Sequence, residues 1–450
     1  MNSRGSSLQT TGISRRRLLR ALMGSAAVLA TGGCGSARIR TPSPAKSATQ
    51  VSKVRLQMIG VYQPQPNRGI SKLLRDYERR RENVSIQYQY FPSEQFVALF
   101  TAAQQSGQQI DVLLLNGQDI RRYATTGALL PMDDIPYKDR FQELAIKTYT
   151  IDGHLWGVPT GSTGGFNIMV NRYLLRQVGA EYPATYDDLV AIAKELRRLG
   201  VSAFTHPGKI IYLWPVWFFT TYAQVTRNRS EERTMETLRG DGSFTDPEVV
   251  EALDLIFRFA RDGLFTPDVL SLDTHGAERA FITGRAAFSL GNYGYTDAVQ
   301  TQRVPHMDLW AELMPRLVSD KAVKSQFPGG PGAPLCLYKR IPEDHIPSAK
   351  DLIAFLTSNE SDRYLVRDAH AALGVNKGVL GDNSPLTVQL GKLLPHMTVY
   401  LDWFWPPEVT QAFQQGIQAG VAGQKSAQQV ARDIQAVFDR LRKQGYKFQG

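Results

Sequence analysis

The chain has 450 residues, of which 42% are hydrophobic, 10% aromatic and 21% charged. This length and composition predict two or three globular units and exclude a disordered chain. Its two cysteines exclude a disulfide framework and offer no Cys-x-x-Cys pair for zinc or redox chemistry. The formal net charge of +10 would suit a nucleic-acid partner, but five arginines and no acid lie in residues 1–33. Because half of the excess charge belongs to this short segment, no nucleic-acid partner is expected.

Residues 1–33 have the pattern of an export signal, with arginines, an apolar stretch and small residues in that order. The paired arginines within residues 14–20 resemble the twin-arginine signal, which exports folded proteins. The small residues before Cys34 resemble a lipoprotein cleavage site, although Thr31 departs from its pattern. Acylation of Cys34, for example by palmitate, is therefore expected; the alternative is a secretory signal with an incidental cysteine. Residues 34–52 are predicted to be a tether.

The folded part is predicted to begin with alternating strands and helices. Residues 54–59 and 84–90 alternate apolar and polar side chains, which is typical of strands. Residues 70–81 repeat apolar side chains at helical spacing, and a second helix is expected near residues 93–106. Residues 110–115 form a continuous apolar run, as in a strand covered on both faces. The order predicts a doubly wound α/β unit.

A second α/β unit is predicted after the turn-rich residues 159–165. Residues 166–170 and 286–290 are predicted strands. Cys336 lies in another short apolar run and is interpreted as a buried strand thiol. Caps and apolar periodicity predict helices over residues 187–199, 247–261, 348–357 and 407–443, the last interrupted at Gly416, Gly420 and Gly423.

Four stretches of the chain carry a family resemblance: residues 111–134, 152–189, 280–293 and 348–358. The second, which opens with DGHLWGVP, is the most specific. In this order they resemble the extracellular solute-binding proteins of ATP-driven (ABC) importers, sugar-binding family 1, which includes the maltose-binding type. The resemblance implies an α/β fold of the type II periplasmic-binding-protein class. Two lobes, each a helix-covered sheet, would close around a ligand in the cleft by hinge rotation.

The resemblance also implies that each lobe is discontinuous in sequence. Hinges are expected near residues 160–163, 325–330 and 375, where glycines supply backbone freedom, although the same glycines suit ordinary turns. The expected boundaries are 53–161 and 326–375 for the N-terminal lobe, and 162–325 and 376–450 for the C-terminal lobe.

A sugar offers an apolar face and a rim of hydroxyls, so its site needs aromatic rings and polar side chains. Aromatic residues cluster within residues 212–219 and 403–405. If neighbours in each cluster point to opposite faces, half are core residues, and we expect Trp214 and Trp405, rather than Trp217 and Trp403, to stack on the ligand. By position, Trp214 and Trp405 match aromatic ligand contacts of the maltose-binding type, and Tyr293 stands where that type usually has a tryptophan.

Polar candidates follow the predicted strands at their carboxyl ends, where open α/β sheets bind ligands. Each could instead be a solvated loop residue. The predicted ligand-binding residues are Tyr62, Gln63, Glu94, Asn116, Gln118, Asp119, Trp214, Tyr293, Gly330 and Trp405.

No motif for catalysis, metal binding or a cofactor is found. The acidic pairs Asp133-Asp134 and Asp187-Asp188 are interpreted as a turn and a helix start, and the seven histidines show no metal-ligand spacing. Carboxylates can nevertheless converge in space, so a lipid-anchored carbohydrate-active enzyme stays open, as does a binder of a non-sugar solute. The expectation is a lipid-anchored extracytoplasmic monomer without cofactor, not an enzyme, that passes a carbohydrate to an ABC permease.

Overall fold

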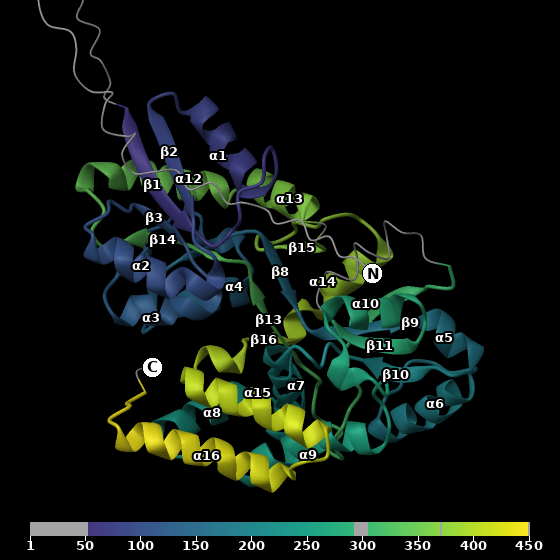
Figure 1. Ribbon diagram of the computed structural model, residues 1–450. Coiled ribbons are helices and arrows are strands. Elements are labelled where there is room, and N and C mark those ends of the chain that lie inside the picture. Colours follow the sequence, from purple (N-terminus) through teal and green to yellow (C-terminus); the bar gives the residue numbers. More distant parts are fainter. Residues whose placement is uncertain (1–52, 292–304, 370, 449–450) are drawn as a thin grey trace, which may run out of the picture. The chain divides into compact units, whose positions relative to one another are not determined.

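The computed structural model describes residues 53–291, 305–369 and 371–448 (Figure 1). The predicted export signal, the tether, Cys34 and Tyr293 lie outside the described residues. Within those residues, no helix combines the length and apolar character that crossing a membrane requires.

The first lobe is built on a mainly parallel sheet, as its strand and helix pattern predicts. Strand β1 pairs in parallel with β2 and β3, whereas β14, which comes much later in the chain, is antiparallel to β3, β4 and β7. Its elements are β1 (Val54–Gly60), α1 (Gly69–Arg80), β2 (Val84–Tyr90), α2 (Phe96–Gln105), β3 (Val112–Leu114), α3 (Ile120–Thr125), β4 (Leu129–Leu130), α4 (Glu143–Tyr149), β5 (Thr150–Ile151), β6 (His154–Leu155), β7 (Val158–Pro159), β14 (Pro334–Tyr338), α12 (Ile346–Leu356) and α13 (Asn359–Asp368).

The second lobe surrounds a four-stranded sheet of order β10-β11-β9-β12. Its core is separate from that of the first lobe and rich in aromatic rings. Its elements are β9 (Asn167–Asn171), α5 (Arg172–Gln177), α6 (Tyr186–Arg198), β10 (Ser202–Thr205), α7 (Pro215–Val225), α8 (Ser230–Arg239), α9 (Pro247–Arg261), α10 (Thr274–Ile282), β11 (Ala286–Gly291), β12 (Leu309–Glu312), α15 (Pro407–Val421) and α16 (Ala427–Lys443).

A third sheet joins segments that are far apart in the sequence. Its order is β15 (Leu373–Gly374), β8 (Ser162–Gly165), β13 (Phe327–Pro331) and β16 (Met397–Thr398), with α14 (Pro385–Leu393) nearby. Strand β8 pairs with both β13 and β15. The three regions predicted as hinges therefore lie side by side in or next to one sheet; their role as hinges stays a prediction.

Two glycines predicted to interrupt the last helix lie inside it instead. Helix α15 continues through Gly416 and Gly420 and ends at Val421. A Cβ at Gly420 would collide with the ring of Phe257 on α9, and one at Gly416 would lie 2.5 Å from Val430 on α16. These glycines therefore let three helices pack closely, which outweighs their poor helix propensity.

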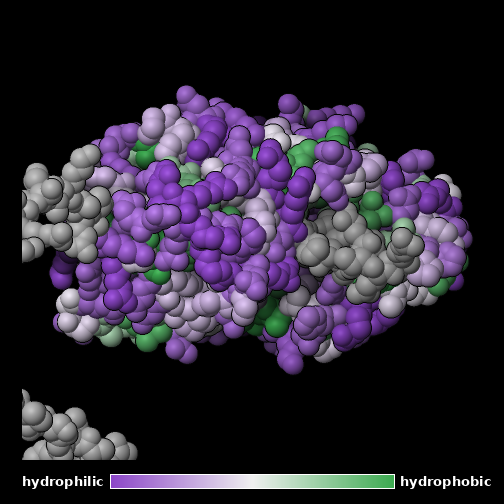
Figure 2. Space-filling view, turned by 90° about the horizontal axis from the view of Figure 1, so that it is seen from above, coloured by the Kyte–Doolittle hydropathy of each residue, from purple (hydrophilic) through white to green (hydrophobic). Residues whose placement is uncertain are grey.

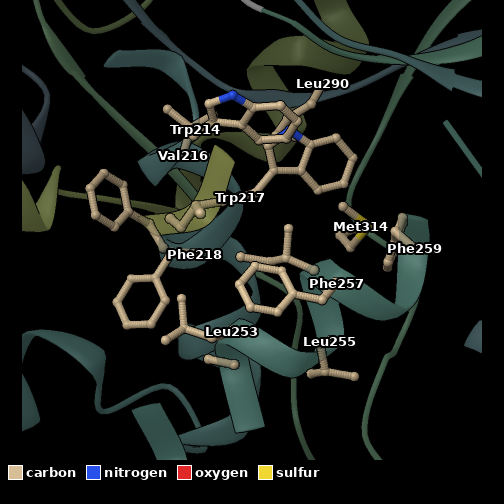
Figure 3. Packing of buried hydrophobic residues seen from close by; sticks show 14 of the residues in the cluster. Trp214, Val216, Trp217, Phe218, Leu253, Leu255, Phe257, Phe259, Leu290 and Met314 are labelled. Carbon is tan, nitrogen blue, oxygen red and sulfur yellow. The ribbon is translucent and has the colours of Figure 1, made fainter. Parts of the chain in front are cut away.

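The aromatic cluster of residues 212–219 does not alternate between two faces. Helix α7 begins with Pro215 at its first position and is buried from Pro215 to Gln224. Trp214 and Trp217 are both 0% exposed and lie among the side chains of the second core (Figure 3). The assumption of alternation is therefore wrong here, because a helix surrounded by protein buries every face.

Several local predictions are confirmed. Cys336 is fully buried in β14, and burial raises the pKa of its thiol. Thr185 and Asp188 form a capping box at the start of α6, and Asp133 accepts hydrogen bonds in a turn.

On the face seen from above the molecule, hydrophilic residues predominate and hydrophobic ones form small, separate patches (Figure 2).

Candidate functional site

A cavity of about 130 Å³ lies between the two lobes. We call it the interlobe cavity. The first lobe contributes the turn after β3 and one side of α4, whereas the second contributes α8 and the segment before α15. The residues that line it are Gly117, Gln118, Ile120, Arg121, Lys147, Thr148, Thr150, Ile151, Glu231, Met235, Val399, Trp403 and Phe404.

The indole of Trp403 is the main aromatic surface at this cavity. Its ring lies over two glycines of other segments: a Cβ would be 2.6 Å from Trp403 Cη2 at Gly117 and 3.3 Å at Gly330. Trp403 packs against the first core, whereas its neighbours Tyr400 and Phe404 pack against the second. Trp403 therefore bridges the lobes. Its ring has room because Gly117 and Gly330 carry no side chains.

The local sequence explains why Trp403 faces the cavity. Leu401 is 1% exposed and anchors one end of the 3₁₀ turn Leu401–Trp403 in the second core. Trp405 anchors the other end, since its ring stacks on Phe413 of α15 with centroids 4.1 Å apart. With residues on both sides held in the core, the intervening Trp403 is directed outward, toward the first lobe.

The structure corrects the prediction that Trp214 and Trp405 supply stacking surfaces. Trp214 Nε1 donates to the carbonyl of Gly208 (3.0 Å), and its ring lies against His206, with centroids 4.4 Å apart. Trp405 is 6% exposed and surrounded by Phe219, Phe244 and Phe413. Both rings are core residues here, and Trp403 is the one that reaches a cavity. The one sequence signal for this arrangement is the helix start at Pro406-Pro407, which places Trp405 beside the new helix.

The predicted polar residues after β3 lie together, but only one lines the cavity. Asn116 Nδ2 donates to Asp119 Oδ2 (3.1 Å), and Ser93 Oγ donates to Asn116 Oδ1 (3.0 Å). Asn116 and Asp119 thus pair with each other, and burial raises the pKa of Asp119. Gln118 alone of the three lines the interlobe cavity. The backbone of Glu94 lies in the short 3₁₀ turn Ser93–Gln95, next to this group.

Tyr62 and Gln63 line a different cavity, of about 430 Å³, which also touches Gly161 and Ser162. The Tyr62 hydroxyl accepts a hydrogen bond from the amide of Ala333 (3.2 Å). The structure therefore does not bring this predicted pair to the same cavity as Gln118.

Tyr149, which the sequence analysis did not single out, fixes the turn between β13 and β14. Its buried hydroxyl donates to the carbonyl of Gly332 (2.6 Å), and burial raises its pKa well above the ordinary value. Tyr62 holds the next residue of the same turn, Ala333. The two hydroxyls thereby set the path of the chain directly after Gly330, which lies beside Trp403.

Charged side chains from both lobes meet at the cavity. The guanidinium of Arg121 lies 5.3 Å above the ring centre of Phe404, and Lys147 Nζ lies 2.8 Å from Glu231 Oε2. Nearby, burial raises the pKa of Asp402 to about 7, and its Oδ1 has no hydrogen-bond partner among the described residues.

This arrangement is suited to binding. A flat ring, an amide and charged groups converge on one opening, which are the features that a polar ligand with an apolar face requires. In the described part of the chain, no three His, Cys, Asp or Glu side chains are grouped so that they could hold a metal ion.

A family model for the bacterial extracellular solute-binding proteins matches residues 72–388. The chain therefore belongs to this family of binding proteins, and its place is extracytoplasmic. Among curated proteins, an uncharacterized ABC transporter extracellular-binding protein of Pyrococcus horikoshii is 22% identical over 234 residues. That match covers 51% of this chain and 55% of the relative, so the two share about half of their lengths.

Solved structures of two-lobed solute-binding proteins share the fold. A family 1 extracellular solute-binding protein of Bifidobacterium longum subsp. infantis superposes with a TM-score of 0.70 at 16% identity, covering 86% of this chain and 100% of that one. A binding protein of Bacillus subtilis in an open conformation gives a TM-score of 0.74 at 14% identity, with 88% and 99% coverage. The GacH receptor of Streptomyces glaucescens gives 0.68 at 15% identity, with 88% and 100% coverage.

Proposed function

We propose that this protein is the solute-binding component of an ABC import system that captures a carbohydrate between its lobes and passes it to a membrane permease. The observation that carries the proposal is the interlobe cavity, where the ring of Trp403 and the amide of Gln118 from opposite lobes face one opening. The indole offers a surface for the apolar face of a sugar, and the amide offers a partner for its hydroxyls. Solved structures of this fold include proteins named for maltose, raffinose and chitin oligosaccharide.

Isothermal calorimetry tests this proposal after a thermal-shift screen with maltose, raffinose, acarbose and chitin oligosaccharides. A bound sugar raises the melting temperature by mass action, and burial of its apolar face gives a negative heat-capacity change of binding. Chromatography of the released sugar should show it unchanged. Accumulation of cleaved product would identify a carbohydrate-active enzyme instead. A response to a phosphodiester or a polyamine, with none to the sugars, would identify a non-sugar solute.

We further propose that Cys34 carries the lipid anchor that holds the protein at the membrane. The support is the order of basic, apolar and small residues before it. Replacement Cys34→Ser should move the protein from the membrane fraction to the soluble fraction and abolish palmitate labelling, because the thiol is the acylated group. Cys336→Ser is the matched control and should leave both unchanged, since that thiol is fully buried. Membrane association that survives Cys34→Ser would contradict the anchor.

A further inference from the structure

One ion pair links the two lobes across the mouth of the interlobe cavity. Lys147 on α4 belongs to the first lobe and Glu231 on α8 to the second, and their charged atoms lie 2.8 Å apart. In the part of the chain that the structure describes, the other ion pairs join residues of the same lobe, as Arg80 and Glu360 do. The pair between Lys147 and Glu231 is therefore placed to report on, and to influence, the distance between lobes.

The ion pair lies where several cavities approach one another. Lys147 lines the interlobe cavity and two others, of about 430 Å³ and 550 Å³. Glu231 lines the interlobe cavity and the larger of these two. Lys147 thus borders all three cavities, and the pair as a whole borders two of them.

Glu231 is available for this contact because the arginines near it, at the N-cap of α8 and within the helix, pair with other acids. Arg229 binds Glu232 with a distance of 2.6 Å, and Arg233 binds Glu236 at 2.5 Å. These arginines therefore form their ion pairs within the second lobe, whereas Glu231 pairs with Lys147 of the first lobe.

We propose that Lys147 and Glu231 form a latch that biases the two lobes toward the arrangement in which their charged atoms meet, as they do in this structure. Their side chains are 63% and 37% exposed, so the pair adds little to the stability of the whole fold. Open and closed arrangements of hinged proteins, however, differ by small free energies, so a weak contact made in only one of them shifts their populations. The strength of an exposed ion pair predicts a change of about two- to fivefold in the ratio of molecules with the lobes in this arrangement to molecules with the lobes apart, and salt should reduce this change.

Distance measurement between spin labels tests the latch without any ligand. The labels are placed on Gln105→Cys in α2 and Ala436→Cys in α16, which are exposed positions in different lobes. Cys34→Ser is present in every variant, and the buried Cys336 does not react. At low salt, Lys147→Gln should move population from shorter to longer distances, so that the ratio of the two populations changes by about two- to fivefold. High salt should shift the distance distribution of the labelled parent, which keeps the ion pair, in the same direction. It should leave the distribution of Lys147→Gln nearly unchanged, because no ion pair is left to screen.

Two further variants make the result decisive. The reversed pair, Lys147→Glu with Glu231→Lys, should restore the shorter distances, which also shows that the substituted chains fold. Arg80→Gln, which removes the pair with Glu360 inside the first lobe, should have no effect on the distances. Equal distributions for the parent, Lys147→Gln and the reversed pair would overturn the latch. Because no ligand is used, that result would leave the proposed sugar binding untouched.

Discussion

Trp403 and Trp405 are two positions apart and have opposite environments. Trp405 is enclosed by the rings of the second core, whereas Trp403 crosses to the first lobe and covers Gly117. Of the two indoles in this short segment, one thus anchors it in the core and the other lines the interlobe cavity.

Their substitution by alanine should separate these tasks. Trp403→Ala should weaken carbohydrate binding at least tenfold while the melting temperature stays nearly unchanged, because it removes the ring surface at the cavity. Trp405→Ala should instead lower the free energy of unfolding by about 3–5 kcal/mol, as expected for an emptied core site. Calorimetry and urea unfolding measure the two effects. Trp310→Ala, which removes a partly buried indole outside the cavity, is the control for binding. Full affinity in Trp403→Ala would show that the ligand lies elsewhere.

At the scale of the elements, two glycines inside helices differ in how closely their neighbours pack against them. Gly420 in α15 lies against the ring of Phe257, whereas the nearest atom to a Cβ at Gly391 in α14 would be 3.8 Å away, an ordinary contact. The same residue type therefore has different constraints in two helices.

The substitution Gly420→Ala should destabilise the protein by about 1–3 kcal/mol, since a methyl group must displace Phe257 or the helix. Gly391→Ala should have the opposite sign and stabilise by up to about 1 kcal/mol, because alanine is the better helix former and has room. Denaturant unfolding of both variants measures the difference. Equal effects of the two substitutions would show that helix propensity, rather than packing, sets the stability at these positions.

Elements with a strong apolar period were predictable from the sequence. Residues 54–59 and 247–261 appear as β1 and α9 with nearly the predicted ends, because each buries one face and exposes the other. Helix α7 was missed, since burial on all sides leaves no period to detect. The place of Gln118 at the interlobe cavity follows from its position after a strand, whereas its role in binding stays a prediction. The direction of Trp403 depends on how Leu401 and Trp405 pack into a core made by distant residues.

At the scale of the whole molecule, one buried histidine should make stability depend on pH. His206 is 1% exposed between the rings of Trp214 and Trp217, and burial lowers its pKa to about 3. The unfolded chain binds a proton near the ordinary pKa of 6.5, whereas the folded chain does not. The contribution of His206 to stability is therefore fully present above pH 6.5 and falls as the pH falls toward 3.

The pH profile of unfolding should show this contribution directly. Between pH 6 and 4, the parent should lose about 1.4 kcal/mol per pH unit more than His206→Phe does, because one proton is linked to unfolding. His275→Phe removes a histidine whose side chain is 82% exposed and should keep the slope of the parent. If the parent and His206→Phe have parallel profiles, the buried ring is not the origin of the acid sensitivity.

The position of β14 within the first sheet has a consequence for biosynthesis. This strand lies between β3 and β4 but is made more than 200 residues after them. A ribosome therefore releases the part of the second lobe from β9 to β12, but not α15 and α16, before it supplies the strand that completes the sheet of the first lobe. The nascent chain must hold an unpaired β3 edge, which can pair with other chains, while the segment between β3 and β14 is made. The first lobe therefore cannot complete its sheet until β14 emerges, so the two lobes cannot fold strictly one after the other along the chain.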